Sequence, residues 1–220
     1  RNACKELRRN CSCSLKCSIN FISFLFISYF RPQKYTFSRT LSNFFQRKNI
    51  ENAAVITFDD GYLTNYTYGF PIIQKYKVKT TIFIVTDTVG KDTGNPHFTW
   101  EQAKIMQRSG LVSIQSHTNT HEDILTLDNY NVIRELRLSR YMIEKNLEIK
   151  CDILAFPFGN CNDAVVDAAH KAGYKVVAKV GEKGKNLLYN TRTTPFTRVT
   201  VYGSWTGSDL VDKINELANQ

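Results

Sequence analysis

Two acidic residues stand side by side where a predicted strand ends, in the stretch ITFDDGY at residues 56–62. Asp59 and Asp60 carry like charges, so the pair must face solvent, bind a cation or divide acid and base roles. Asp-Gly is also a common hairpin turn, but a hairpin needs a second strand at once, and a helical segment follows instead. The pair is therefore a candidate for metal or acid–base chemistry.

Two histidines lie four residues apart after a later predicted strand, in the stretch SHTNTH. His117 and His121 have a spacing that metal sites use, although such a pair by itself is more often incidental. An Asp and two neutral imidazoles are a suitable ligand set for Zn²⁺ or a similar divalent ion, with positions left open for water and substrate. One carboxylate can then bind the cation, while the other stays ionised beside a metal-bound water and takes its proton.

A third predicted strand ends in FPFGN, at residues 156–160. Pro157, Phe158 and Gly159 are either an ordinary turn or part of the same site. In parallel α/β architectures ligand chemistry gathers at the carboxyl ends of strands. We therefore expect the acidic pair, the histidine loop and this turn to share one edge of the sheet.

Predicted strands and helices alternate from residue 50 onward. The strands are 53–58, 80–85, 111–116, 151–156, 174–180 and 196–202, and the helices are 65–76, 99–110, 129–147, 162–173 and a last one from Ser208. This alternation predicts one α/β domain with a mostly parallel sheet or barrel. No glycine-rich phosphate loop follows the first of these strands, which argues against a nucleotide-binding Rossmann fold.

The N-terminal segment differs in composition from the rest of the chain. Of the 220 residues, the first 50 hold ten Lys/Arg and one acid, whereas the remaining 170 hold nineteen of each. A basic N-terminus on a neutral body does not predict a nucleic-acid partner. The apolar run 19–30 is too short for a membrane span and suits either a signal-peptide core or a buried strand or helix, which leaves membrane association open. Four cysteines in residues 1–17 have no spacing typical of a zinc site.

The three motifs, in this order, resemble those of the polysaccharide deacetylase family (carbohydrate esterase family four, nodulation-type deacetylase domain). The resemblance runs from about Ala53 to about Ile214 and includes FTWEQAKIMQRSGLVSIQSHTNTH and the late RVTV strand. It implies a distorted (β/α) barrel of seven or eight strands, with the first strand missing or altered. We expect residues 35–220 to form a deacetylase-like catalytic domain, and residues 1–34 an atypical basic segment.

The resemblance also implies roles for individual residues. Asp59 would be the general base, and the ligands of one divalent ion, expected to be Zn²⁺, would be Asp60, His117 and His121. The turn formed by Pro157, Phe158 and Gly159 would line the substrate groove, with a backbone N–H near Phe158 holding the oxyanion. The implied enzyme is an extracellular or cell-envelope hydrolase that removes N-acetyl groups from a cell-surface or cell-wall polysaccharide.

The chain departs from the family pattern in two places. Many members have an Arg two residues before the motif Pro, where this chain has Ala155. Many also supply a general acid from a late Leu-x-His, or from a Tyr-His strand near the N-terminus, but this chain has no His after His170 or before His97. The alternative function is therefore a carbohydrate-binding homologue with weak or no turnover. His97 can be placed either at the catalytic edge or, preferably, in an exposed loop.

Overall fold

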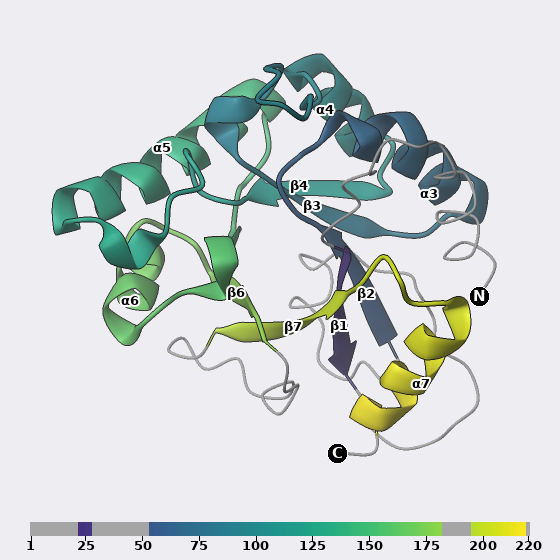
Figure 1. The fold of residues 1–220 in the computed structure, drawn as a ribbon. Helices are drawn as coiled ribbons and strands as arrows, with labels where there is room; N and C mark the ends of the chain where they lie inside the picture. The colour runs from purple at the N-terminus through teal and green to yellow at the C-terminus, as the bar shows by residue number, and fades with distance from the viewer. Residues whose placement is uncertain (1–21, 28–52, 182–194, 219–220) are drawn as a thin grey trace.

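The computed structural model of the chain describes residues 22–27, 53–181 and 195–218 (Figure 1). Seven strands in these ranges form a closed barrel in chain order. They are β1 (Ile22–Ile27), β2 (Ala53–Phe58), β3 (Thr80–Ile84), β4 (Val112–Ser116), β5 (Ile153–Ala155), β6 (Val176–Val180) and β7 (Phe196–Val201). The prediction of an α/β barrel is confirmed.

Six of these strands, β2 to β7, are parallel to their neighbours in the order of the chain. β1 runs antiparallel to both β2 and β7 and closes the barrel between them. β1 lies inside the apolar run 19–30, so the strand interpretation holds for residues 22–27. The rest of the predicted N-terminal segment 1–34, and its boundary with the predicted catalytic domain, lie outside the described residues.

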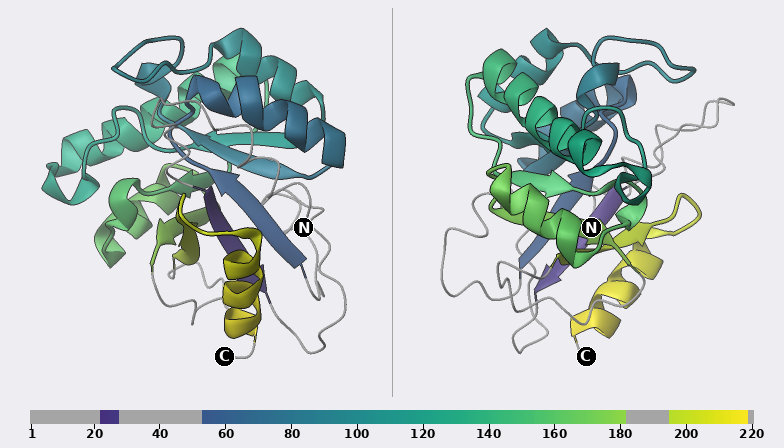
Figure 2. Two further views of the ribbon diagram at one scale, coloured as in Figure 1. Left: turned by 45° about the vertical axis from the view of Figure 1, so that its right-hand side comes forward. Right: turned by 90° about the vertical axis from the view of Figure 1, so that its left-hand side faces the viewer.

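Helices cover the outside of the strands (Figures 1 and 2). They are α3 (Phe70–Tyr76), α4 (Trp100–Arg108), α5 (Asn129–Leu147), α6 (Asp163–Lys171) and α7 (Gly207–Ala218), and a π-helical turn (Asn65–Gly69) leads into α3. Side chains at three helix starts accept backbone N–H groups: Thr99 in a capping box with Gln102, Asp128, and Asn162. None of these helices is long and apolar enough to cross a membrane.

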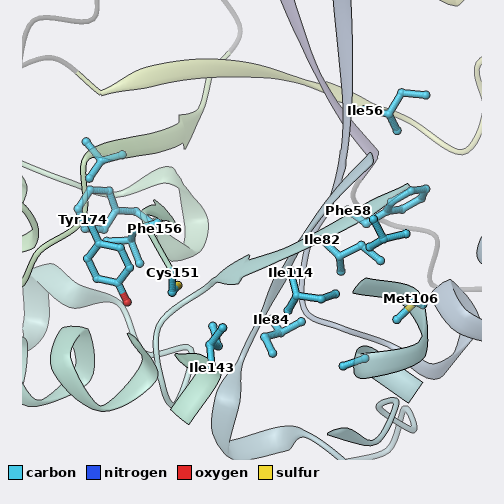
Figure 3. Close-up of a cluster of buried hydrophobic side chains, with 14 of the residues drawn as sticks. Ile56, Phe58, Ile82, Ile84, Met106, Ile114, Ile143, Cys151, Phe156 and Tyr174 are labelled. Carbon is cyan, nitrogen blue, oxygen red and sulfur yellow. The ribbon is translucent and has the colours of Figure 1, made fainter. Parts of the chain in front are cut away.

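The apolar core lies between the strands and the covering helices. Figure 3 shows Ile56, Phe58, Ile82, Ile114 and Met106 converging where β2, β3 and β4 meet α4. Every residue of β3 and β4 is buried, because the barrel interior covers one face of these strands and helices cover the other. The central strands are therefore held firmly enough to position the loops at their carboxyl ends.

Candidate active site

The three predicted motifs meet at one edge of the barrel, each directly after a parallel strand. Asp59 and Asp60 follow β2, His117 follows β4, and the turn Pro157–Gly159 follows β5 by one residue. Backbone strain gathers here: four of the six described non-glycine residues with positive φ belong to these motifs. They are Asp60 (70°), Thr118 (67°), His121 (65°) and Phe158 (59°). Such conformations are costly, and they persist where the surrounding structure fixes them for function.

Asp60, His117 and His121 bring their ligand atoms together. The Oδ1 atom of Asp60 lies 3.6 Å from Nε2 of His117 and 3.3 Å from Nε2 of His121. One ligand atom from each of the three residues lies within 4.8 Å of the other two. This is a candidate metal site made of one carboxylate and two imidazoles, as the sequence predicted.

A backbone contact fixes the orientation of the first histidine. Nδ1 of His117 lies 2.8 Å from the carbonyl oxygen of Ala155, so the N–H is on Nδ1 and the lone pair of Nε2 faces Asp60. Burial lowers the pKa of His117 and outweighs the opposing effect of Asp59 and Asp60, which favours the neutral imidazole that a metal requires. Ala155 stands at the position where many family members have an Arg. In this chain its backbone carbonyl group, rather than a side chain, contributes to the site.

The surroundings of Asp60 favour its carboxylate form. Burial alone would raise the pKa of Asp60, but a hydrogen bond from His121, the attraction that each histidine ring exerts when it is protonated and a hydrogen bond from Tyr62 together lower it. Burial, followed by the charge of Asp60 and the hydrogen bond to it, raises the pKa of Tyr62 to about 12. The hydroxyl of Tyr62 therefore stays protonated and donates to Asp60. Tyr62 is therefore an outer contact of the candidate ligand set, which the sequence analysis did not identify.

Asp59 has a different partner, Arg198 of β7. Nη1 and Nη2 of Arg198 lie 2.6 and 2.8 Å from Oδ1 and Oδ2 of Asp59, a two-pronged ion pair. Arg198 is completely buried, donates also to Oγ1 of Thr57 and stacks on Phe83. Asp59 Oδ2 nevertheless remains 4.0 Å from Nε2 of His117. The first aspartate is thus held rigidly beside the candidate metal site.

The sequence analysis missed Arg198, although a signal was present. It is the one charged residue in the strand FTRVTV, and a charge in a buried strand requires a partner. Ala155, where many relatives place an Arg, left Asp59 without a local partner. The two observations together could have predicted that an arginine distant in sequence takes this position.

Replacing Arg198 by methionine is expected to lower the free energy of unfolding by about 3–5 kcal/mol, because a buried carboxylate is left without its partner. Arg198→Lys should recover only part of this, since an ammonium cannot form the two-pronged contact. Urea unfolding measures the effect. The exposed pair of Lys171 with Asp167 supplies the control, because Lys171→Met should cost less than about 1 kcal/mol. Equal losses for the two methionine variants would contradict the role of Arg198.

The turn Pro157–Gly159 lies beside the second histidine. Phe158 is 65% exposed, and its ring contacts the ring of His121 edge-on, with centroids 4.9 Å apart. A Cβ on Gly159, which has φ +74°, would lie only 2.8 Å from the carbonyl oxygen of Val180. Glycine is therefore required at this position, and the turn is held against β6 with an aromatic side chain exposed next to the site.

His97 is buried, so the expectation of an exposed loop histidine was wrong. Its ring is 4.9 Å from that of Tyr62, and its exposed fraction is 7%. The loop is held down by backbone hydrogen bonds from Leu63 to Pro96 and from Phe98 to Gly61. These long-range contacts are not visible in the local sequence. Burial also lowers the pKa of His97.

Comparisons with known proteins lead to one family. The polysaccharide deacetylase family model matches residues 46–177. The chain is 31% identical over 165 residues to YxkH of Bacillus subtilis (strain 168), named provisionally as a polysaccharide deacetylase, covering 72% of this chain and 58% of the relative. It is 30% identical over 140 residues to the poly-beta-1,6-N-acetyl-D-glucosamine N-deacetylase of Staphylococcus aureus (strain MSSA476), covering 58% and 48%.

The fold comparison leads to the same group. BC0361, a polysaccharide deacetylase from Bacillus cereus, superimposes with a TM-score of 0.69 at 26% identity, covering 82% of this chain and 56% of that one. The chain spans only about half the length of these relatives. Because the family model covers more than half of the chain and the three motifs meet in space, the chain belongs to the polysaccharide deacetylase family.

Proposed function

We propose that this chain is a metal-dependent hydrolase that removes N-acetyl groups from a cell-surface or cell-wall polysaccharide, acting outside the cell or in its envelope. The observation that carries the proposal is the placement of Asp59 beside the Asp60–His117–His121 cluster, held there by Arg198. Two adjacent aspartates thus have different partners, which suits them to different roles.

The donor set fits one divalent ion, and we propose Zn²⁺. The fit rests on the orientation of His117, whose Nε2 is free to coordinate because Nδ1 donates to Ala155. One carboxylate and two imidazoles leave positions for water and for the substrate carbonyl. The ion would polarise the acetyl carbonyl and supply a nucleophile near neutral pH.

The residues of this chain then divide the remaining tasks. Asp59 takes a proton from the attacking water, since its carboxylate is held at the edge of the ligand cluster. Arg198 keeps that carboxylate in one orientation. The N–H of Phe158 is the proposed oxyanion donor, because the neighbouring Gly159 and Asn160 N–H groups already donate within the turn. Pro157, Phe158 and Gly159 would line the groove for the sugar chain.

We propose a β-1,6-linked N-acetylglucosamine polymer as the first substrate to test. The support is the name of the Staphylococcus aureus relative, a poly-beta-1,6-N-acetyl-D-glucosamine N-deacetylase. The exposed ring of Phe158 beside His121 offers a surface on which a sugar ring can stack.

A second candidate function is carbohydrate binding with little turnover. It is favoured by the lack of an assigned general acid among the four histidines. His117 and His121 are proposed ligands, and His170 contacts the carbonyl oxygen of Tyr174 at the end of α6. His97 packs against Tyr62. Expulsion of an amine requires a proton, and general acid assistance contributes about 10²–10⁴-fold in rate.

Activated acetyl esters are therefore expected to be hydrolysed faster than N-acetyl oligosaccharides, because a leaving group such as 4-nitrophenoxide departs without a proton from an acid, whereas an amine does not. The measurement is kcat/KM for 4-nitrophenyl acetate and for N-acetylglucosamine oligomers with the same preparation. His97→Ala is the matched variant. Rapid deacetylation of the oligomers, undiminished in His97→Ala, would show that the chain has an acid other than His97.

The proposed function is tested by acetate release from β-1,6-linked, chitin-type and peptidoglycan substrates. We expect release from at least one N-acetylated polymer and none after Asp60→Asn. Binding of the oligomers without any release of acetate would favour the carbohydrate-binding function instead.

A further inference from the structure

The loop that carries both proposed histidine ligands is strained. It runs from His117 to His121 and contains Thr118 and His121 at positive φ, 67° and 65°. Non-glycine residues adopt this conformation at a cost and keep it only when other contacts fix them. The geometry of the metal site therefore depends on groups outside the loop.

A buried carboxylate of α5 contacts the middle of this loop. Glu135 is 9% exposed, and its Oε2 accepts the N–H groups of Asn119 at 2.9 Å and Thr120 at 2.8 Å. These two residues lie between the two histidines. Hydrogen bonds to an ionised acceptor are about twice as strong as neutral ones, so one side chain fixes two successive peptide groups.

The other side of the loop is held by the segment after β3. Oγ1 of Thr86 donates to Oδ1 of Asn119, and the N–H of Asp87 donates to the carbonyl oxygen of Asn119. The N–H of Thr86 also donates to the carbonyl oxygen of Thr118. This segment thus holds the loop at Thr118 and Asn119, whereas Glu135 of α5 holds it at Asn119 and Thr120. Loss of Glu135 would leave the N–H groups of the half-buried Asn119 and the exposed Thr120 without this acceptor.

We propose that Glu135 is a positioning residue of the metal site: it holds the histidine loop so that Nε2 of His121 meets Asp60. This inference rests on the proposed function, because it assigns Glu135 a role toward the proposed ion. Glu135 acts through the loop backbone. Removal of such an outer contact typically weakens metal affinity by about 10–100-fold.

The test is the Zn²⁺ affinity of the purified chain, measured by competition with a chromophoric chelator. Glu135→Ala is expected to weaken binding by about 10–100-fold. Glu135→Gln keeps the shape of the side chain and one amide oxygen as acceptor. Its Zn²⁺ affinity should therefore lie between those of the wild-type chain and Glu135→Ala. Backbone amide exchange at Asn119 and Thr120 should be faster in Glu135→Ala. The glutamine variant keeps the test valid if the alanine variant does not fold.

Glu144 supplies the matched control from the same helix. Its Oε1 accepts the N–H of Cys151 and pairs with Arg140, away from the histidine loop. Glu144→Ala should lower the thermal midpoint and leave Zn²⁺ affinity unchanged. Wild-type affinity in both Glu135 variants would overturn the positioning role alone. Failure of the wild-type chain to bind one divalent ion would overturn the proposed metal site and this inference with it.

Discussion

Replacing His117 and His121 together by alanine is expected to abolish stoichiometric binding of a divalent ion and, with it, acetate release. Two of the three proposed ligands are lost, and affinity should fall by orders of magnitude because the one carboxylate left cannot replace them. The measurement is the metal content per chain after gel filtration, by mass spectrometry of the elements.

His170→Ala is the control for this pair. His170 contacts the carbonyl oxygen of Tyr174 at the end of α6 and belongs to none of the three motifs. Its replacement should leave the metal content unchanged. One equivalent of metal retained by the double variant would exclude the proposed ligand set.

Asp59→Asn and Asp60→Asn are expected to fail in different ways. Asp59→Asn should keep the metal and lower the rate by about 10²–10⁴-fold, because a positioned base is lost. Asp60→Asn should lose metal and activity together, since its Oδ1 lies within 3.6 Å of both histidine nitrogens. Metal content and acetate release are measured on the same samples.

Because Asp59 is paired with Arg198, the Asp59→Asn variant must also be shown to be folded. An amide offers Arg198 one oxygen in place of two, so the variant should also be less stable, and the assays belong well below its unfolding temperature. Circular dichroism of the two variants establishes that both are folded. Equal loss of metal in Asp59→Asn and Asp60→Asn would show that the aspartates do not divide the roles.

Most of the fold could be predicted from local sequence patterns. The helix 129–147 was predicted with the bounds it has, because its apolar positions repeat at helical spacing; the structure adds that Asp128 caps its start. The six strands after residue 50 are all present, although β5 keeps only residues 153–155 of the predicted 151–156. Element ends are the least certain part of a pattern, since the terminal backbone groups have no fixed partner within the element.

The candidate metal site was predictable for a related reason. Asp60, His117 and His121 each follow a strand, and the rule that carboxyl ends of parallel strands share an edge brings them together. The order of the strands around the barrel determines how near to one another these strand ends lie. The local signal for each ligand was weak, and their joint placement made it strong.

The contacts that hold these residues were not predictable in the same way. Arg198 is 139 residues from Asp59 in the chain, and Glu135 reaches its two N–H donors from a helix that follows the loop. Arg198 is the one charged residue of its strand, and Glu135 is the one charged residue on the buried face of α5. A sequence pattern shows that such a residue needs a partner, but the three-dimensional packing decides which partner it finds.

The central claim is most directly tested by acetate release before chelation, after chelation and after return of one equivalent of Zn²⁺. The substrate is the N-acetylated polymer on which the chain is most active, and His121→Ala is treated in parallel. We predict that wild-type release disappears on chelation and returns with the ion, while His121→Ala remains inactive at one equivalent. Full acetate release by the chelated, metal-free wild-type chain would contradict the account.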